Sequence, residues 1–147
     1  MKLYLASSWR NEHYPALVRV MRAEGHEVFD WRSPKPEACG FHWSEIDRDW
    51  RDWTPDQFKA GLYHPKAMAG FNSDYEGMQW ADACVLVLPC GRSAHLEAGW
   101  FDGKGKPLYI LLAKGFEVEL MYHMSDGIFA NTSELLDVIG SPSKAEL

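Results

Sequence analysis

A glutamate at position 97 is the residue whose surroundings are hardest to explain by ordinary helix chemistry. It lies in the segment CGRSAHLEAGW, residues 90–100. A capping box would place the acid at position 96, which is leucine, and an i,i+4 ion pair would need a cation at 101, which is phenylalanine. Glu97 is therefore either a nucleophilic carboxylate on a partly apolar helix face or a solvated acid. The residues alone leave both possibilities open.

A second carboxylate, Asp74, lies in FNSDYEGMQWAD, residues 71–82, which is typical of a helix that leads into an apolar segment. An aspartate in the first turn of a helix complements the helix dipole and needs no catalytic reason. Two carboxylates in one cleft are nevertheless the minimal equipment for cleaving a glycosidic bond. One attacks or stabilises the anomeric carbon, and the other moves protons.

The start of the 90–100 segment predicts a site for an anion. Small residues there join a buried strand to a helix, and Ser93 is the expected N-cap. A helix that begins at this point presents backbone N–H groups and the positive end of its dipole to a ligand.

Other chemistries fit the sequence less well. A run of acids invites a calcium hypothesis: Glu45, Asp47, Asp49 and Asp52. A twelve-residue calcium loop counted from Asp47 needs glycine at its sixth position and glutamate at its twelfth, where this chain has Asp52 and Phe58. The GKGK run at 103–106 lacks the Ser or Thr of a phosphate loop and precedes a strand. We predict no metal and no cofactor.

A thiol nucleophile is a further alternative, because Cys90 precedes His95 by five residues. A buried structural cysteine explains Cys90 better, since it lies where a predicted strand ends. The six histidines show no His-x-x-x-His spacing.

Alternating strands and helices must position these residues. Apolar runs predict strands at 2–6, 26–31, 83–88, 107–112 and 127–130, and helical spacing predicts helices at 11–24, 94–103, 118–124 and 133–139. This order predicts an α/β fold: a Rossmann-like (flavodoxin-like) parallel sheet of about five strands with helices on both faces. Such sheets bind ligands at the carboxyl ends of their strands. Chemistry is therefore expected in the loops after Ala6, Leu88 and Leu112.

The chain is predicted to be a single domain, 1–147, with an insert at about 32–65. The insert holds Trp43, Trp50 and Trp53, whose spacing of seven and three could place them on one face of a short helix. Core packing of that helix is one explanation. The other is a lid over the carboxylates, with an aromatic side chain stacked on a nucleobase.

Composition excludes several classes of protein. The chain has 147 residues, of which 46% are hydrophobic, enough for a conventional core. Its 15 basic and 21 acidic residues give a net charge of −6 with no basic run, which disfavours a nucleic-acid polymer as partner. No apolar stretch approaches the ~20 residues of a membrane span. The opening MKLYLASSWRNE turns polar too early for a signal peptide, and three cysteines without C-x-x-C spacing suit the cytoplasm.

Several of these segments together resemble the nucleoside 2-deoxyribosyltransferase superfamily, which includes the 2'-deoxynucleoside 5'-phosphate N-hydrolases. They are YLASSWRN at 4–11, Asp74 ahead of the Ala-Asp pair that opens the third strand, SAHLEAG at 93–99, and LMYHMSDG at 120–127 with the residues up to Asn131. The order and spacing of these segments carry the resemblance, which covers nearly the whole chain apart from the insert.

The resemblance implies a role for each of three catalytic residues. Glu97 would be the nucleophile that forms a glycosyl-enzyme intermediate, Tyr4 would hydrogen-bond Glu97, and Asp74 would be the acid or base that handles the nucleobase. The expected substrate-binding residues are Ser7, Ser8, Trp9, Arg10, Gly91, Ser93, His95 and Asn131. Of these, Ser8, Arg10 and Ser93 would line the 5' end of the sugar. Asn131 would be offered to the site of a neighbouring subunit, because the family builds its sites across an oligomer interface.

Two positions separate hydrolysis from base exchange. Transferases of the superfamily carry an aspartate six residues before the nucleophile, where this chain has Gly91. Arg10 resembles the phosphate-accepting hydrolases, and a guanidinium is well matched to a phosphate. We therefore predict hydrolysis of the N-glycosidic bond of a (deoxy)nucleoside 5'-monophosphate, by a homodimer or higher homo-oligomer. The alternatives are base exchange between deoxyribonucleosides and a nucleotide-binding sensor that has lost catalysis.

Overall fold

The computed structural model describes residues 1–35 and 39–140. Within them the chain forms two compact units. One unit contains residues 1–30 and the chain from Trp80 onward, and is called the sheet unit below. The other contains residues 31–79 and is called the insert unit.

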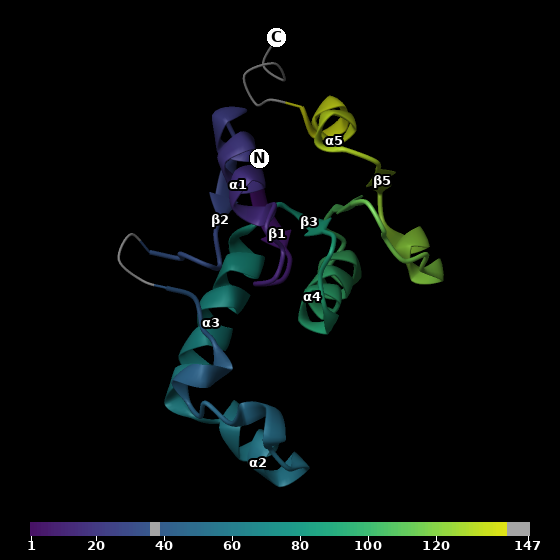
Figure 1. Ribbon diagram of the computed structural model, residues 1–147. Helices are drawn as coiled ribbons and strands as arrows, with labels where there is room; N and C mark the ends of the chain where they lie inside the picture. Colours follow the sequence, from purple (N-terminus) through teal and green to yellow (C-terminus); the bar gives the residue numbers. More distant parts are fainter. Residues whose placement is uncertain (36–38, 141–147) are drawn as a thin grey trace. The chain divides into compact units, whose positions relative to one another are not determined.

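The sheet unit is built on five parallel strands in the order β2-β1-β3-β4-β5 (Figure 1). The strands are β1 (Lys2–Ala6), β2 (Glu27–Phe29), β3 (Ala83–Val87), β4 (Leu108–Leu111) and β5 (Gly127–Phe129). Every residue of β3 is buried, as expected of a central strand covered on both faces. The predicted α/β class, the parallel sheet and the five strands are confirmed.

Helices cover both faces of this sheet. They are α1 (Tyr14–Ala23), α4 (Arg92–Gly103) and α5 (Thr132–Ile139). A 3-10 helix, η3 (Leu120–Met124), comes between β4 and β5 along the chain. The connection through α1 leads from β1 to β2, and the connection through α4 leads from β3 to β4, in the opposite direction along the sheet. Right-handed crossovers in opposite directions place their helices on opposite faces, as Figure 1 shows for α1 and α4.

The predicted elements differ from the observed ones mainly at their ends. The segment 118–124 was expected as an α-helix and is instead a 3-10 helix with extended residues on both sides. Ser93 is not the N-cap of α4. The helix begins at Arg92, two residues before the predicted start at 94, and Gly91 is its N-cap in an extended conformation. Gly25 follows the first helix with φ of 94°, a conformation that glycine adopts without a Cβ penalty.

The insert unit consists of short helices joined by turns: η1 (Trp43–Glu45), η2 (Trp50–Asp52), α2 (Pro55–Leu62) and most of α3 (Pro65–Trp80). The prediction that Trp43, Trp50 and Trp53 share one helix is wrong. Asp47 turns the chain between them, since its carboxylate accepts hydrogen bonds from the Asp49 amide (2.9 Å) and from Trp53 Nε1 (2.8 Å).

The aromatic residues of the insert unit still pack together. The Trp43 ring lies 5.8 Å from the Trp53 ring and 5.9 Å from the Phe58 ring. A Cβ at Gly61 would lie 2.7 Å from Trp53, so only glycine permits this approach. These side chains, with Trp50 and Arg51, line a hollow of about 320 Å³. Packing within the unit is thus confirmed for Trp43 and Trp53, and the lid hypothesis stays a prediction.

A buried histidine links three parts of the sheet unit and makes its stability depend on pH. His26 is 4% exposed; its Nε2 lies 2.6 Å from the Gly140 carbonyl and its Nδ1 3.2 Å from the Met1 amine. Burial lowers the pKa of His26 from the usual 6.5, so the folded chain binds this proton more weakly than the unfolded chain. The free energy of unfolding should therefore decrease as pH falls below about 6.5.

Thermal unfolding between about pH 7.5 and pH 5.5 checks this expectation. His26→Gln places an amide near the Gly140 carbonyl and does not titrate, so its melting temperature should fall less over this range than that of the wild type. A parallel fall in both proteins would show that His26 does not cause the pH dependence.

Candidate active site

The sheet has one switch point, between β1 and β3. After β1 the chain crosses to β2 on one side, and after β3 it crosses to β4 on the other. The connections that leave the carboxyl ends of these two strands run in opposite directions there, and open α/β sheets bind ligands at such a point. Residues 7–11 and 88–91 form these two loops.

Hydrogen bonds hold the 7–11 loop against the end of β3. The Ser7 hydroxyl donates to the Val87 carbonyl (3.0 Å), and the Asn11 side-chain amide donates to the same carbonyl (3.3 Å) and to Ser7 Oγ (3.0 Å). Asn11 is 1% exposed and also accepts from the His13 amide through Oδ1. The sequence analysis did not predict this anchoring role of Asn11. The available signal was an asparagine at the end of the polar loop that follows a buried strand. The loop is therefore anchored independently of substrate.

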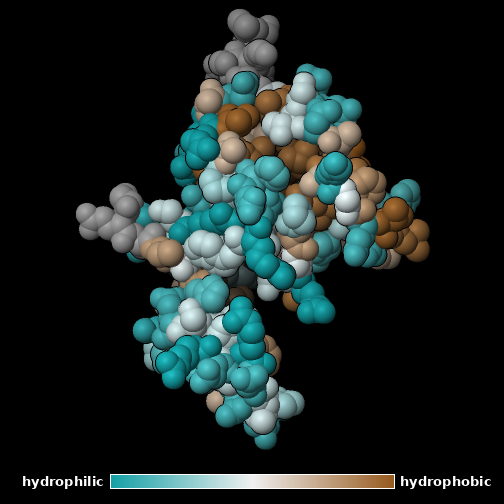
Figure 2. All heavy atoms as spheres, viewed as in Figure 1, coloured by the Kyte–Doolittle hydropathy of each residue, from teal (hydrophilic) through white to brown (hydrophobic). Residues whose placement is uncertain are grey.

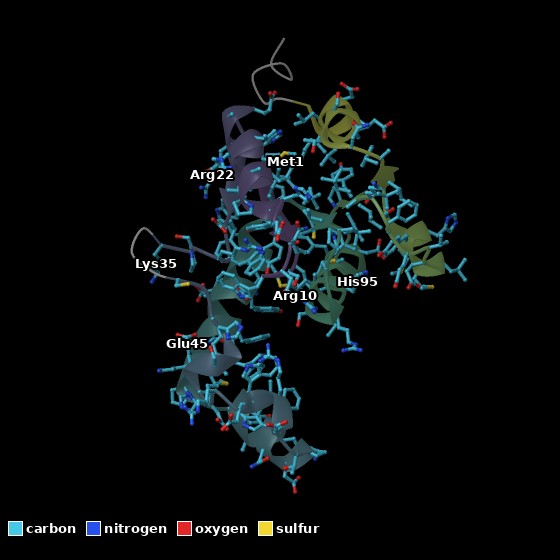
Figure 3. All side chains as sticks on the ribbon, in the orientation of Figure 1. Met1, Arg10, Arg22, Lys35, Glu45 and His95 are labelled. Carbon is cyan, nitrogen blue, oxygen red and sulfur yellow. The ribbon has the colours of Figure 1, made fainter. Side chains whose placement is uncertain are left out.

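Besides Ser7, the same loop contains three more of the predicted substrate-binding residues. Ser8 is half-buried and its Oγ accepts a hydrogen bond from the Arg10 amide (3.2 Å). The Trp9 and Arg10 side chains are exposed. Figure 3 shows Arg10 and His95 at the same edge of the sheet unit, where the strands end. The loop thus offers an aromatic ring and a cation at the switch point.

Glu97 is half-buried in the interior of α4. The buried stripe of this helix is Ala94, Ala98 and Phe101, and Glu97 lies on one flank of it, three residues after Ala94 and four before Phe101. Neither a cap nor an i,i+4 pair explains it, as the sequence predicted.

The charge of Glu97 acts on two thiols. Burial, and then the Glu97 carboxylate, raise the pKa of Cys84 well above its usual value, and the same two causes raise the pKa of Cys90 to about 12. A carboxylate acts in this way only at short range. Both thiols therefore stay protonated near neutral pH, which disfavours Cys90 as a thiolate nucleophile. The role of Glu97 as nucleophile stays a prediction.

Tyr4 lies on the same face of the sheet as Glu97. It is fully buried in β1 and pairs in register with Cys84 of β3, so their side chains point to one face. Its ring stacks on Phe29 at 5.7 Å and contacts Phe101 of α4 at 5.6 Å. The phenol and Glu97 thus share the α4 side of the sheet. The direct hydrogen bond between Tyr4 and Glu97 stays a prediction.

His95 lies on the opposite flank of α4. Two residues along an α-helix correspond to about 200° of rotation, so His95 and Glu97 point to different sides of the buried stripe. The His95 ring lies 2.7 Å from the Gly91 carbonyl through Nδ1 and 2.9 Å from the Tyr122 hydroxyl through Nε2. With Tyr122 it lines a hollow of about 290 Å³ beside η3. Direct contact of His95 with substrate stays a prediction.

Asp74 belongs to the insert unit and lies in the middle of α3. The helix begins at Pro65, more than two turns earlier, so the first-turn explanation of Asp74 is wrong. It shares a helix face with Gly70, Gly77 and Met78, of which the last two are buried, and burial raises its pKa to about 7. A carboxyl group with this pKa can donate or accept a proton near neutral pH. A cleft shared by Asp74 and Glu97 stays a prediction.

Comparison with known proteins identifies the fold. No protein-family model and no curated protein matches the chain. A solved 2-deoxyribosyltransferase from Bacillus psychrosaccharolyticus superposes with a TM-score of 0.66 at 23% identity, over 92% of this chain and 90% of the other. The chain has the 2-deoxyribosyltransferase fold.

Two further structures share this fold. The CMP N-glycosidase from Clostridium botulinum matches with a TM-score of 0.51 and 18% identity, over 95% of this chain and 98% of the other. A conserved protein from Enterococcus faecalis matches with a TM-score of 0.60 and 16% identity, over 100% of this chain and 99% of the other. The 2-deoxyribosyltransferase-like fold predicted from the sequence is confirmed.

The last two predicted substrate-binding residues lie at helix starts. Ser93 is exposed in the first turn of α4. Asn131 is exposed and caps α5, since its Oδ1 accepts from the Glu134 amide (2.9 Å) while the Glu134 carboxylate accepts from the Ala130 amide (2.8 Å). This cap accounts for Asn131 locally, and its role in a neighbouring subunit stays a prediction.

The residues that the structure describes, 1–35 and 39–140, lack two kinds of feature. They contain no group of three or more His, Cys, Asp or Glu side chains placed to hold a metal ion. In the same residues, none of the helices has both the length and the apolar character that crossing a bilayer requires.

Proposed function

We propose that this chain hydrolyses the N-glycosidic bond of a nucleoside 5'-monophosphate, with Glu97 as the nucleophile. The position of Glu97 carries the proposal: it is a half-buried carboxylate on α4, close enough to Cys84 of β3 and to Cys90 to raise their pKa values, and on the same sheet face as Tyr4. The fold supports it, since a 2-deoxyribosyltransferase and a CMP N-glycosidase have the same architecture.

The reaction needs two steps. In the first, a Glu97 oxygen attacks the anomeric carbon while the bond to the base breaks and Asp74 donates its proton to the departing base. In the second, water attacks the same carbon and returns the electron pair of the ester bond to Glu97, while Asp74 takes the proton from water. Two displacements at one carbon retain its configuration. The products are the free base and the sugar phosphate.

Two features at the switch point suit the 5' phosphate. Among the described residues no side chain caps the start of α4, where glycine holds the N-cap, so its first N–H groups can bind an anion. Arg10 extends from the neighbouring loop with an exposed guanidinium. Arginine binds phosphate through two parallel hydrogen bonds.

Replacing Arg10 by alanine tests this substrate class. Wild-type protein should cleave a deoxynucleoside 5'-monophosphate much faster than the matching nucleoside, because charged hydrogen bonds contribute about 1.5–3 kcal/mol each. Arg10→Ala should remove most of this preference. The control is Arg19→Ala, an exposed arginine on α1. Equal cleavage of nucleotide and nucleoside by the wild type would exclude the phosphate role and favour base exchange.

Base exchange is the second candidate, because one structure of the same fold is a transferase. Gly91 stands where the resembling transferases carry aspartate, and a Cβ placed there would meet no heavy atom within 4 Å. Its φ of −99° is also open to any residue. Gly91→Asp should therefore fold normally and increase transfer of the sugar to an added base relative to water. Chromatography with a second base measures this ratio, and an unchanged ratio would show that position 91 does not select the acceptor.

We also propose that the chain works in the cytoplasm as a homodimer or larger homo-oligomer. The described cysteines form no disulfide, which suits a reducing compartment. Large apolar side chains are exposed along and before η3, with Val118 88% and Leu120 85% exposed. Figure 2 shows hydrophobic residues gathered over η3. A second copy of the chain would cover this surface. Sedimentation velocity measures whether the chain forms a dimer or a larger oligomer.

A further inference from the structure

We propose that His95 is a positioning residue that fixes the first turn of α4 for the substrate phosphate by linking Gly91 to Tyr122. This inference rests on the proposed function, because it assigns the phosphate to that turn. It departs from the expectation that His95 contacts the substrate itself.

The first part of the argument is the carbonyl of Gly91. It receives the His95 ring nitrogen Nδ1 at 2.7 Å, whereas the backbone amide of His95 lies at 3.4 Å from the same oxygen. Of the two hydrogen bonds to the Gly91 carbonyl, the one from the His95 side chain is therefore shorter than the one from the His95 backbone amide. Gly91 has open space around its Cα, and glycine is the most flexible residue of a chain. The conformation of this turn therefore depends on the bond from His95.

The second part is the anchor on the other side of the ring. The Tyr122 hydroxyl lies 2.9 Å from His95 Nε2, and the two rings are nearly parallel, with centroids 5.7 Å apart. Tyr122 is itself held in η3, since its carbonyl accepts from the Ser125 amide (3.0 Å) and the Ser125 hydroxyl (2.7 Å). His95 therefore connects α4 to a segment 27 residues further along the chain.

The third part is which nitrogen of the His95 ring donates a hydrogen bond and which accepts one. A nitrogen that faces a carbonyl must donate, so Nδ1 carries a hydrogen. The Nε2 atom of the neutral ring accepts from the Tyr122 hydroxyl, and the Nε2–H of a charged ring would donate to the same oxygen. The hydrogen bonds of His95 to Gly91 and to Tyr122 can therefore form with a neutral or a charged ring, as expected of a residue that links these two positions permanently. The ring also points away from the Glu97 flank, so His95 acts on the substrate through the Gly91 turn.

Variants can break the two bonds separately. Asparagine reproduces the position of Nδ1, so His95→Asn keeps a donor for Gly91 and loses Tyr122. Glutamine reaches the position of Nε2, so His95→Gln keeps a partner for Tyr122 and loses Gly91. Tyr122→Phe removes only the hydroxyl. The matched control is His123→Gln, an exposed histidine next in sequence to Tyr122.

Kinetics with a nucleotide and with the matching nucleoside give the first test. His95→Gln should raise KM for the nucleotide about tenfold, the equivalent of one lost hydrogen bond, with kcat within about threefold. KM for the nucleoside should not change. His95→Asn and Tyr122→Phe should each raise KM for the nucleotide by less than His95→Gln does, and by similar factors. The double variant His95→Asn with Tyr122→Phe should have a KM no higher than that of either single variant, because both changes break the same bond. Equal losses for both substrates, or losses in kcat alone, would overturn the proposal.

Hydrogen exchange of the free protein gives a second test that needs no turnover. The amides of residues 95–98, which in an α-helix donate to the carbonyls of residues 91–94, should exchange faster in His95→Gln than in the wild type, and His123→Gln should leave them unchanged. Unchanged exchange in His95→Gln would overturn the proposal, even in an active enzyme. Absence of turnover in the wild type would contradict the proposed function, and the exchange rates would then still decide whether His95 holds the turn.

Discussion

Glu97→Gln should bind nucleotide with nearly unchanged affinity and lose turnover by several orders of magnitude. The amide has almost the volume of the carboxylate but cannot attack the anomeric carbon. A loss confined to kcat identifies an interaction made only in the transition state. Calorimetric titration with a deoxynucleoside 5'-monophosphate measures the affinity, and chromatography of the released base measures kcat.

The matched control is Asp102→Asn, which neutralises another half-buried acid of α4, five residues beyond Glu97. It should keep wild-type turnover, because it lies away from the switch point. Near-normal turnover by Glu97→Gln would end the covalent mechanism and leave electrostatic stabilisation or a different nucleophile.

Asp74→Asn should lower kcat/KM by about 10²–10⁴-fold, the usual contribution of general acid–base catalysis. Burial raises the pKa of Asp74 to about 7, so the wild-type carboxyl loses its proton as pH rises through this value. The first step requires that proton, and wild-type kcat/KM should therefore fall above about pH 7. The variant should lack this limb of the profile.

Stability gives an independent check of the same pKa. Between the ordinary pKa of an aspartate and the raised value of about 7, the folded chain holds a proton that the unfolded chain has lost. The free energy of unfolding should therefore decrease as pH rises through this range, and Asp74→Asn should remove that part of the decrease. Glu76→Gln, an exposed acid on the same helix, is the control. Identical pH profiles for Asp74→Asn and wild type would show that Asp74 does not titrate in this range.

The sheet could be predicted because its signal is local. An apolar run such as Ala83–Val87 cannot be solvated on either face, so it specifies a central parallel strand without knowledge of its neighbours. Helical spacing over 11–24 likewise predicted α1, although of the residues that carried this spacing Leu17 and Met21 are buried while Ala16 and Val20 are exposed.

The errors occurred where a distant or unusual partner decides the local structure. Ser93 is a better N-cap than Gly91 by propensity, yet the helix starts at Arg92, and the carbonyl of Gly91 is bound by the His95 side chain. The three tryptophans had helical spacing, yet the Asp47 carboxylate turns the chain between them. Neither the His95–Gly91 bond nor the bonds to the Asp47 carboxylate can be recognised from the spacing of apolar residues in the sequence.

The candidate site was predictable in part for the same reason. Glu97 could be singled out because every ordinary helical role failed for it within five residues. The proximity of its carboxylate to Cys84 depends on how α4 packs against β3. The anchoring role of Asn11 depends on the pairing of β1 with β3, whose residues are about 80 positions apart.

Trapping the intermediate on Glu97 is the most direct test of the central claim. Wild-type protein is mixed with a 2'-deoxynucleoside 5'-monophosphate, quenched in acid within one turnover and digested for mass spectrometry. We predict that the peptide containing Glu97 carries one deoxyribose phosphate, that the label disappears when the reaction is allowed to finish, and that Glu97→Gln carries none. Release of free base with no label on this peptide at any time would contradict the account.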